Sequence, residues 1–552
     1  MVLDRLQRAI ATRPLAASIL GVAAVLALWL AWSPPGANDL EGGEAAYGVM
    51  ARNILAEPRQ LLGPSATPLG APGDKPPLYP AAIAALIRVL GPNELAVRLP
   101  SLLAAGLVAV ATALVAGRVA GNWAMPLAAL LLMTVPWFAD LSRHAVGEIP
   151  LTALGVLGLA LATATPLTAR RAALAGALFG LAFLCQLWLA GLLLLPAAAA
   201  AWPRRDESAK PIVAMLLVAL GVASAQLAAV ALLRSQDLAH WWRVYWLPAA
   251  ATRAVVEGIA GGVVSPAHHW NGMLRACVWL LPLGLVGAWV CVRHWREPAP
   301  RALLVWAGGL LLLSLGRIEG AYADYPVFPA WAALAAVGAV TLAASDYPPR
   351  WLVFAGAAAA SPAAAELLGG PVPSAPLWAI AWLTLVAAIP VLRVGRRFAG
   401  PALAVVCLVP IAGGFARQAR RLPPRYHEIG YREVAAALAP RLADAPPASA
   451  SYLSAEAPAM AFYLFRSGGE WGTPARPWSP DRLAGIAGDA RLRAFVVDPE
   501  SQRRGGGPDP ATLAWLADSA REITHEVRAR SARPVRLRVF VRETAGRLPS
   551  TP

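Results

Sequence analysis

The sequence has little charge for its length. Only 14% of its 552 residues are charged, whereas 58% are hydrophobic, and the mean hydropathy is +0.54. A soluble protein of this size needs far more charge to cover its surface. The composition therefore excludes a soluble globular protein and predicts a mainly α-helical, polytopic membrane protein.

Cysteine is also scarce. The four cysteines, all in apolar stretches or at their ends, are Cys185, Cys277, Cys291 and Cys407. This pattern excludes a disulfide framework or a cysteine metal cluster and indicates small packing residues. The pair His268–His269 is weak evidence for a metal site, and a packing role or a contact with an acceptor is favoured. No metal site is predicted, although a divalent cation stays open as a cofactor.

Lysine occurs only at Lys75 and Lys210, so the net charge of +16 comes almost entirely from arginine. Basic runs interleaved with aromatic residues are lacking, which argues against a nucleic-acid partner. In a membrane protein an excess of arginine marks the cytoplasmic loops.

Long apolar runs follow one another along the first three quarters of the chain. They lie near 15–34, 99–117, 123–142, 149–165, 172–202, 212–233, 272–293, 302–316, 327–344, 351–368, 376–393 and 398–415. The run 172–202 has basic residues at both ends and is too long for one span, so we expect two short helices broken near Gln186. The total is then about thirteen transmembrane helices.

The arginines between these runs alternate in a way that places the N-terminus in the cytoplasm of a bacterium and the protein in its inner membrane. Three segments then lie outside: 35–98, 234–271 and everything after about 416. We expect a membrane domain over 1–415 and a small periplasmic α/β domain over 416–552. The latter has strand-like runs at 450–453, 492–497 and 535–541 and an amphipathic helix near 510–528.

The first outer segment carries unusual residues. Asp39, Glu41 and Glu44 directly follow the first span, and helical patterns with one apolar face cover 45–55 and 78–90. Such helices lie in the membrane interface. The first of them holds Tyr47 and Arg52.

Two more polar clusters are predicted on the same outer face. One contains Arg143, His144 and Glu148, and the other contains Arg317, Glu319, Tyr322 and Asp324. Ionisable groups at the membrane edge are costly unless they are paired or used, so their convergence predicts a functional site.

The motifs in these segments resemble those of the GT-C membrane glycosyltransferases, in particular the aminoarabinose transferases of lipid A and bacterial relatives of protein O-mannosyltransferases. The matching stretches are Glu44-Ala-Ala-Tyr47, Ala51-Arg52, Lys75-Pro-Pro-Leu78 and Glu94-Leu-Ala-Val-Arg98-Leu-Pro-Ser. Glu148 matches a second acidic position, and 322–329 loosely matches a tyrosine- and proline-rich motif. Two positions differ: Gly43 stands where the family has an aspartate, and Gln186 where relatives often have a lysine.

The resemblance implies an inverting transfer of a sugar from a polyprenyl-phosphate donor to a lipid, glycan or protein acceptor. A carboxylate must remove the acceptor's proton, and positive charge must stabilise the leaving phosphate. The candidate catalytic residues are Glu44, Glu41, Asp39 and Glu148. The candidate phosphate ligands are Lys75, Arg52, Arg98 and Arg143, and the candidate substrate contacts are Tyr47, Tyr322, Arg317, His268 and His269.

Other interpretations stay open at this point. Lys75 and Arg98 also suit anchors at a membrane edge, and Glu148 suits the start of a helix. A transporter or flippase of a lipid-linked sugar is the alternative function. It would be expected to show internal repeats and charged or Gly/Pro-broken helices at mid-membrane, and of these features only the break near Gln186 is found. A non-catalytic membrane scaffold needs no converging carboxylates.

Overall fold

The structure is a computed structural model that divides into two compact units. It describes residues 12–32, 34, 38–40, 42–61, 76–185, 187–202, 208–235, 238–239, 280–313, 325–344, 429–445, 450–453, 457–464, 492–499, 510–531 and 534–542. Unit 1 comprises 1–34 and 101–423, and unit 2 comprises 35–100 and 424–552.

Unit 1 is built of apolar helices. They are α2 (Pro14–Trp32), most of α5 (Glu94–Ala120), α6 (Ala124–Met133), α7 (Pro136–Ser142), α8 (Glu148–Ala162), α9 (Ala169–Phe183), α10 (Leu187–Ala201), α11 (Lys210–Leu233), α15 (Leu281–Arg293), α16 (Pro298–Leu313) and α17 (Val327–Ala344). Within the described residues, the helices α2, α5 and α11 are long and apolar enough to cross a membrane, and the bent pair α6–α7 adds a fourth candidate.

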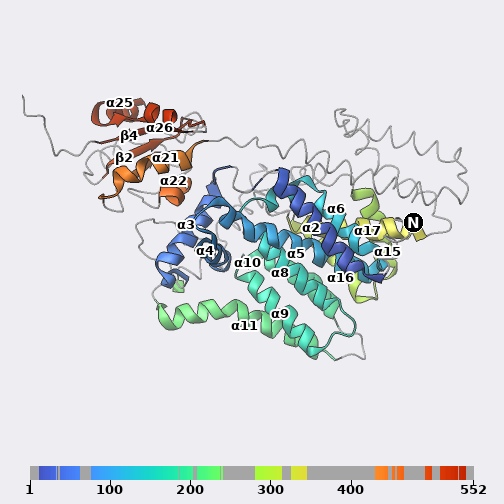
Figure 1. Ribbon diagram of the computed structural model, residues 1–552. Helices are drawn as coiled ribbons and strands as arrows, with labels where there is room; N and C mark the ends of the chain where they lie inside the picture. The colour runs from blue at the N-terminus through green and yellow to red at the C-terminus, as the bar shows by residue number, and fades with distance from the viewer. Residues whose placement is uncertain are drawn as a thin grey trace, which may run out of the picture. The chain divides into compact units, whose positions relative to one another are not determined.

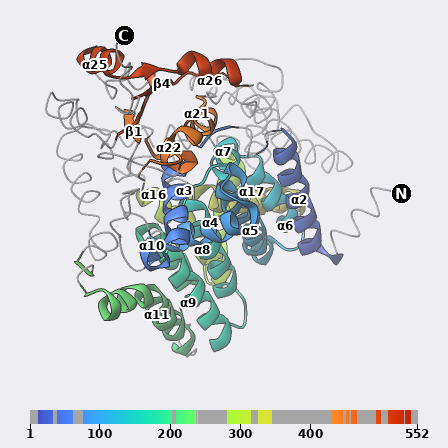
Figure 2. The same ribbon diagram turned by 60° about the vertical axis from the view of Figure 1, so that its left-hand side comes forward.

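Helix α17 lies inside this unit, because nearly all of its described side chains are buried and it packs against α6, α15 and α16. A helix that is apolar all round is expected in such a position. At the edge of the unit, α11 packs along α9 (Figures 1 and 2). Gly176 and Gly180 of α9 allow this close approach, since a Cβ at either position would meet the backbone of α11 at Met215 or Ala219.

The expected break near Gln186 is confirmed, because α9 ends at Phe183 and α10 begins at Leu187. The apolar run 123–142, expected to form one span, contains two helices. Helices α6 and α7 are bent by 72° at a short break. Val135 is extended and Pro136 starts α7, as expected for a proline that lacks an N–H and disfavours helix in the residue before it.

Unit 2 combines the first outer segment with the C-terminal region. The first part holds α3 (Gly42–Ala56), η1 (Pro58–Leu61), α4 (Leu78–Leu90) and the first turns of α5. The second part holds α21 (Tyr431–Leu438), η3 (Pro440–Leu442), β1 (Ala450–Leu453), α22 (Ala457–Leu464), β2 (Ala494–Val497), α25 (Pro510–Ser519), β3 (Arg521–Glu522), α26 (Thr524–Arg530) and β4 (Arg538–Val541). The helices expected over 45–55 and 78–90 are observed as α3 and α4, and their position in the membrane interface stays a prediction.

A four-stranded sheet with the order β1-β2-β4-β3 organises the C-terminal part of unit 2. β1 and β2 are parallel, whereas β4 is antiparallel to both β2 and β3. Phe495 and Phe540 share a buried core with Leu516 of α25. Helices α21 and α22 lie on the other side of the sheet from α25 (Figure 1).

The single helix expected near 510–528 is wrong. Helix α25 ends at Ser519, and Arg521 and Glu522 then pair with Val541 and Phe540 before α26 begins. The Ile523 N–H donates to the Val539 carbonyl at 2.8 Å, which diverts the backbone from helical pairing. This pairing with a distant strand outweighs the local helical pattern.

The division into units cuts across the expected domains. Residues 35–98 were expected to belong to the membrane domain, whereas the structure groups 35–100 with the C-terminal region. The boundary between the two units falls inside α5, between Pro100 and Ser101.

Candidate functional site

Arg98 organises the acidic segment that follows the first span. Its side chain is only 6% exposed and lies on the first turns of α5. Its Nε and Nη2 donate to the two carboxylate oxygens of Glu44 at 3.0 and 2.8 Å. Nη1 and Nη2 also donate to the carbonyls of Asn38 and Asp39, both at 3.0 Å. Arg98 was predicted as a phosphate ligand or an anchor. In the structure these N–H groups bond to a carboxylate and two carbonyls of the protein itself.

Asp39 connects the same segment to helix α21. Its Oδ2 accepts the backbone N–H groups of Gly430 at 3.0 Å and Tyr431 at 2.9 Å. Gly430 has φ +92°, a left-handed conformation that favours glycine. Burial, and secondarily the negative charge of Glu433, raises the pKa of Asp39 above its ordinary value. A carboxylate with a raised pKa is a stronger base than an exposed one.

Glu94 forms a second polar centre in unit 2. Its Oε1 accepts from Arg432 and from the Tyr463 hydroxyl, the latter at 2.7 Å. The same hydroxyl accepts the Leu40 N–H at 2.9 Å. Burial raises the pKa of Tyr463, so the phenol stays protonated and donates to Glu94. The acidic segment is thus bonded at Asp39 and at Leu40 to residues of the C-terminal region.

Helix α3 holds two further predicted residues. Arg52 donates through Nη1 to the Phe462 carbonyl, and burial lowers the pKa of Arg52 to about 10. Tyr47 is buried, and its ring meets that of Tyr79 edge to face with centroids 4.9 Å apart. Both side chains therefore take part in the packing of unit 2.

The other described candidates lie in unit 1. Arg143 and Glu148 flank the turn between α7 and α8 and are half-buried. His144 lies 4.0 Å from Asp140, measured from Nε2 to Oδ1. Nearby, the buried hydroxyl of Tyr325 is 3.0 Å from Ser142 Oγ. Tyr325 immediately follows the cluster predicted at 317–324.

Six of the predicted residues lie outside the part of the chain that the structure describes: Glu41, Lys75, His268, His269, Arg317 and Tyr322. Their roles stay predictions. Among the described residues, no group of three or more His, Cys, Asp and Glu side chains is arranged to hold a metal ion.

Several residues that bond to the acidic segment from far along the chain were not expected from the sequence. Gly430, Arg432 and Tyr463 were not singled out, and Glu94 was noted only as part of a motif. Glu94 and Tyr463 are 369 residues apart, so no local pattern reveals the contact. The one available signal in the sequence was that Glu94 is followed four residues later by Arg98 at the start of an apolar run.

Comparison with known proteins agrees with this fold. Residues 74–228 match the family model of the dolichyl-phosphate-mannose-protein mannosyltransferases. No curated protein matches the sequence. ArnT from Cupriavidus metallidurans bound to undecaprenyl phosphate has 18% identity and a TM-score of 0.62, covering 96% of this chain and 98% of that one.

Two further structures are similar. ArnT from the same organism in the apo state gives 18% identity and a TM-score of 0.59 over 95% of this chain and 97% of that one. The oligosaccharyltransferase AglB from Archaeoglobus fulgidus, in complex with an inhibitory peptide and a dolichol-phosphate, gives 12% identity and a TM-score of 0.50 over 88% and 70%. At these identities the likeness is one of fold.

Proposed function

We propose that this chain, which has the fold and the family signature of the GT-C membrane glycosyltransferases, transfers a sugar from a polyprenyl-phosphate donor to an acceptor on the outer face of the membrane. The observation that carries the proposal is the family match, which begins at residue 74, one position before Lys75. The acceptor is a lipid, a glycan or a protein. The transfer inverts the configuration at the anomeric carbon.

In this reaction an acceptor oxygen forms a bond to the anomeric carbon while the bond from that carbon to the donor phosphate breaks. The acceptor proton passes to a carboxylate, and the lipid phosphate leaves with the bonding electrons. The leaving phosphate needs a cation, which Lys75 supplies as a point charge held by the stiff Pro76–Pro77 segment that follows it.

The base is one of Asp39, Glu41 and Glu44. Glu44 is held by Arg98 at both carboxylate oxygens, which fixes its position. Asp39 has one oxygen bonded to two N–H groups and a raised pKa, which favours proton acceptance. Arg98 acts as a positioning residue for this segment.

The test uses the purified full-length protein in liposomes with a radiolabelled polyprenyl-phosphate sugar and a lipid extract from the source membrane. A transferase produces free polyprenyl phosphate and a labelled acceptor in equal amounts. A flippase moves the donor across the bilayer without cleaving it, so an intact donor with changed sidedness contradicts the proposal. Mass spectrometry of lipid extracts from a deletion strain then identifies the glycoconjugate that loses a sugar.

A further inference from the structure

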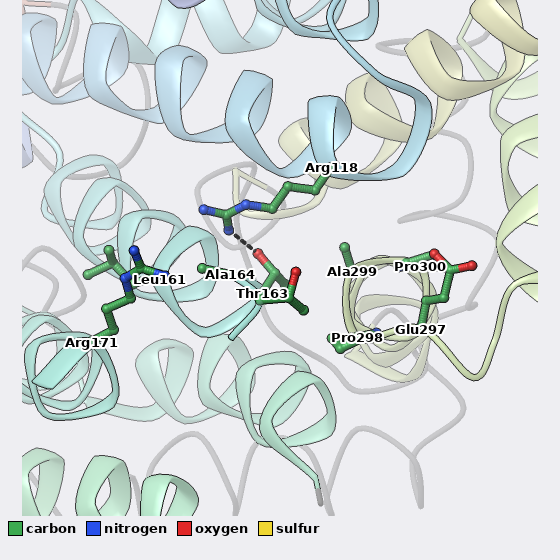
Figure 3. A pocket seen from close by; sticks show the side chains of 10 residues that line it. Arg118, Leu161, Thr163, Ala164, Arg171, Glu297, Pro298, Ala299 and Pro300 are labelled. Atoms are coloured by element: carbon green, nitrogen blue, oxygen red, sulfur yellow. Dashed lines mark hydrogen bonds between the residues drawn. The ribbon is translucent and has the colours of Figure 1, made fainter. Parts of the chain in front are cut away.

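Unit 1 contains a cavity of about 560 Å³ between the ends of four helices. Its wall includes Arg118 near the end of α5, Leu161 and Thr163 at the end of α8, Arg171 at the start of α9, and 297–300 at the start of α16. Figure 3 shows the Arg118 side chain extending from α5 toward Thr163, across the gap from Ala299.

The cavity is positively charged. Arg118 donates through Nη1 to the Thr163 hydroxyl, and Arg171 donates through Nη1 to the Pro166 carbonyl at 3.2 Å. Each bond uses one of the five N–H groups of its guanidinium. The one carboxylate in the wall, Glu297, is 3.0 Å from His294 Nδ1. The two guanidinium groups carry the same charge and repel each other. An anion placed between them is attracted by both.

Exposed tryptophans flank the helix ends around the cavity. Trp123 follows α5, Trp202 follows α10, and Trp295 precedes α16, and all three are exposed. Arg301 of α16 donates to the carbonyls of Ala200 and Trp202, which places the end of α10 beside the start of α16. Exposed tryptophans gather at the level of the lipid head groups.

From this combination we propose that the cavity binds the phosphate of an anionic phospholipid, between Arg118 and Arg171. By the predicted topology this lipid belongs to the cytoplasmic leaflet, on the other side of the membrane from the proposed transfer. Leu161, Ala164 and 298–300 provide the apolar part of the wall, which suits a glycerophospholipid better than a free anion. Basic cavities between membrane helices are suited to such head groups.

The test compares the full-length protein with the double variant Arg118→Ala/Arg171→Ala. Arg170→Ala is the matched control, because Arg170 neighbours Arg171 but does not line the cavity. After delipidation, binding of phosphatidylglycerol and phosphatidylcholine is measured by native mass spectrometry. Two arginines are expected to favour phosphatidylglycerol by roughly tenfold or more. The double variant loses this preference, whereas Arg170→Ala keeps it.

Thermal unfolding in detergent gives the second measurement. Phosphatidylglycerol raises the melting temperature of the original protein and of Arg170→Ala, but not of the double variant. If a double variant that melts normally without lipid keeps the preference for phosphatidylglycerol, the proposal is overturned. If inorganic phosphate at matched ionic strength stabilises as much as the lipid, a soluble anion rather than a phospholipid is the occupant, and the lipid assignment is overturned.

Discussion

Arg98 holds Glu44 by a bidentate ion pair whose shorter contact, from Nη2 to Oε2, is 2.8 Å, with both side chains almost fully buried. The pair joins two sequence motifs that are 54 residues apart. Breaking a buried pair by removing one partner costs about 3–5 kcal/mol, whereas replacing both partners with apolar residues is often neutral. This asymmetry makes it possible to separate a structural from a catalytic role of Glu44.

The first prediction concerns Glu44 alone. Glu44→Gln keeps the size of the side chain and removes its charge and basicity. If Glu44 is the base, transfer falls by roughly two to four orders of magnitude, the usual contribution of general-base catalysis. If Glu41→Gln is inactive and Glu44→Gln is active, Glu41 is the base instead. Transfer rates are measured on protein whose melting temperature is recorded in parallel.

Replacing the pair provides the control. Glu44→Leu together with Arg98→Met removes both charges and leaves neither unpaired, so the double variant should melt above Glu44→Gln, although the carbonyls of Asn38 and Asp39 lose their donor. If Glu44 is the base, this double variant is folded but inactive. Recovery of transfer in the double variant shows that Glu44 only supports the fold.

The second prediction concerns Lys75. A charge-assisted contact to the donor phosphate contributes about 1.5–3 kcal/mol, so Lys75→Ala should weaken donor binding roughly ten- to a hundredfold. Lys75→Arg should keep part of the affinity, because the contact is a point charge. Lys210→Ala is the matched control, since Lys210 is the other lysine and is predicted on the opposite side. Unchanged donor affinity in folded Lys75→Ala protein, measured by titration, contradicts the phosphate role.

The third prediction concerns the packing of α3 on α22. A Cβ at Gly48 would lie 2.6 and 2.9 Å from two ring carbons of Phe462, so Gly48→Ala forces the ring to move. Overpacking of this kind costs about 1–3 kcal/mol. Gly43→Ala is the control on the same helix, because nothing lies within 4 Å of its Cβ position. Thermal unfolding should show a lower melting temperature for Gly48→Ala only; equal melting temperatures would contradict this packing.

The fourth prediction concerns pH. Because burial raises the pKa of Asp39 above 3.8, the protonated form is favoured in the folded state. Its contribution to stability is complete below the unfolded pKa and is lost as the pH rises through the folded pKa. Asp39→Asn cannot ionise and still offers an oxygen to the N–H groups of Gly430 and Tyr431.

The stability of the original protein relative to Asp39→Asn should therefore decline as the pH rises from about 4 toward neutrality. Melting temperatures of both proteins over this range provide the measurement. A difference that does not change with pH contradicts the raised pKa. Asp39→Ala should lose about 0.5–2 kcal/mol at low pH, where the contribution of the carboxyl is complete, because the first turn of α21 loses its acceptor.

The fifth prediction concerns topology. The arginine pattern places Arg205 inside and Pro423 outside, so reporter fusions after these two residues should give opposite signals. The structure adds one relationship to this pattern. Arg118, Arg171 and the start of α16 line one cavity, so loops predicted on the same side lie together at one end of unit 1. Equal signals from both fusions contradict the topology.

Much of the helical fold could be predicted from local sequence. The range 78–90 matches α4, and the break near Gln186 is observed, since periodicity and basic flanks are local signals. The bend before Pro136 and the split of 510–528 were not anticipated. The bend depends on a single proline within an apolar run. The split depends on pairing with a distant strand that begins at Arg538.

The candidate site shows the same limit. The sequence brought Asp39, Glu44, Tyr47, Arg52 and Arg98 to attention because their residue types suit the chemistry. It could not assign their partners, because Asp39 bonds to Gly430 and Arg52 to Phe462 across several hundred residues. Such contacts depend on tertiary packing, which has no period along the chain.

The bond from Gly430 to Asp39 spans 391 residues, and this separation has a consequence for how the protein is made. Ribosomes add about 5–20 residues per second, so Asp39 waits roughly 20–80 s for its partner after it has been synthesised. During that interval Glu94 also lacks Arg432 and Tyr463, and Arg52 lacks Phe462. Biogenesis therefore completes the acidic segment last, and a nascent chain released before residue 430 carries three ionisable groups without the partners that stabilise their burial.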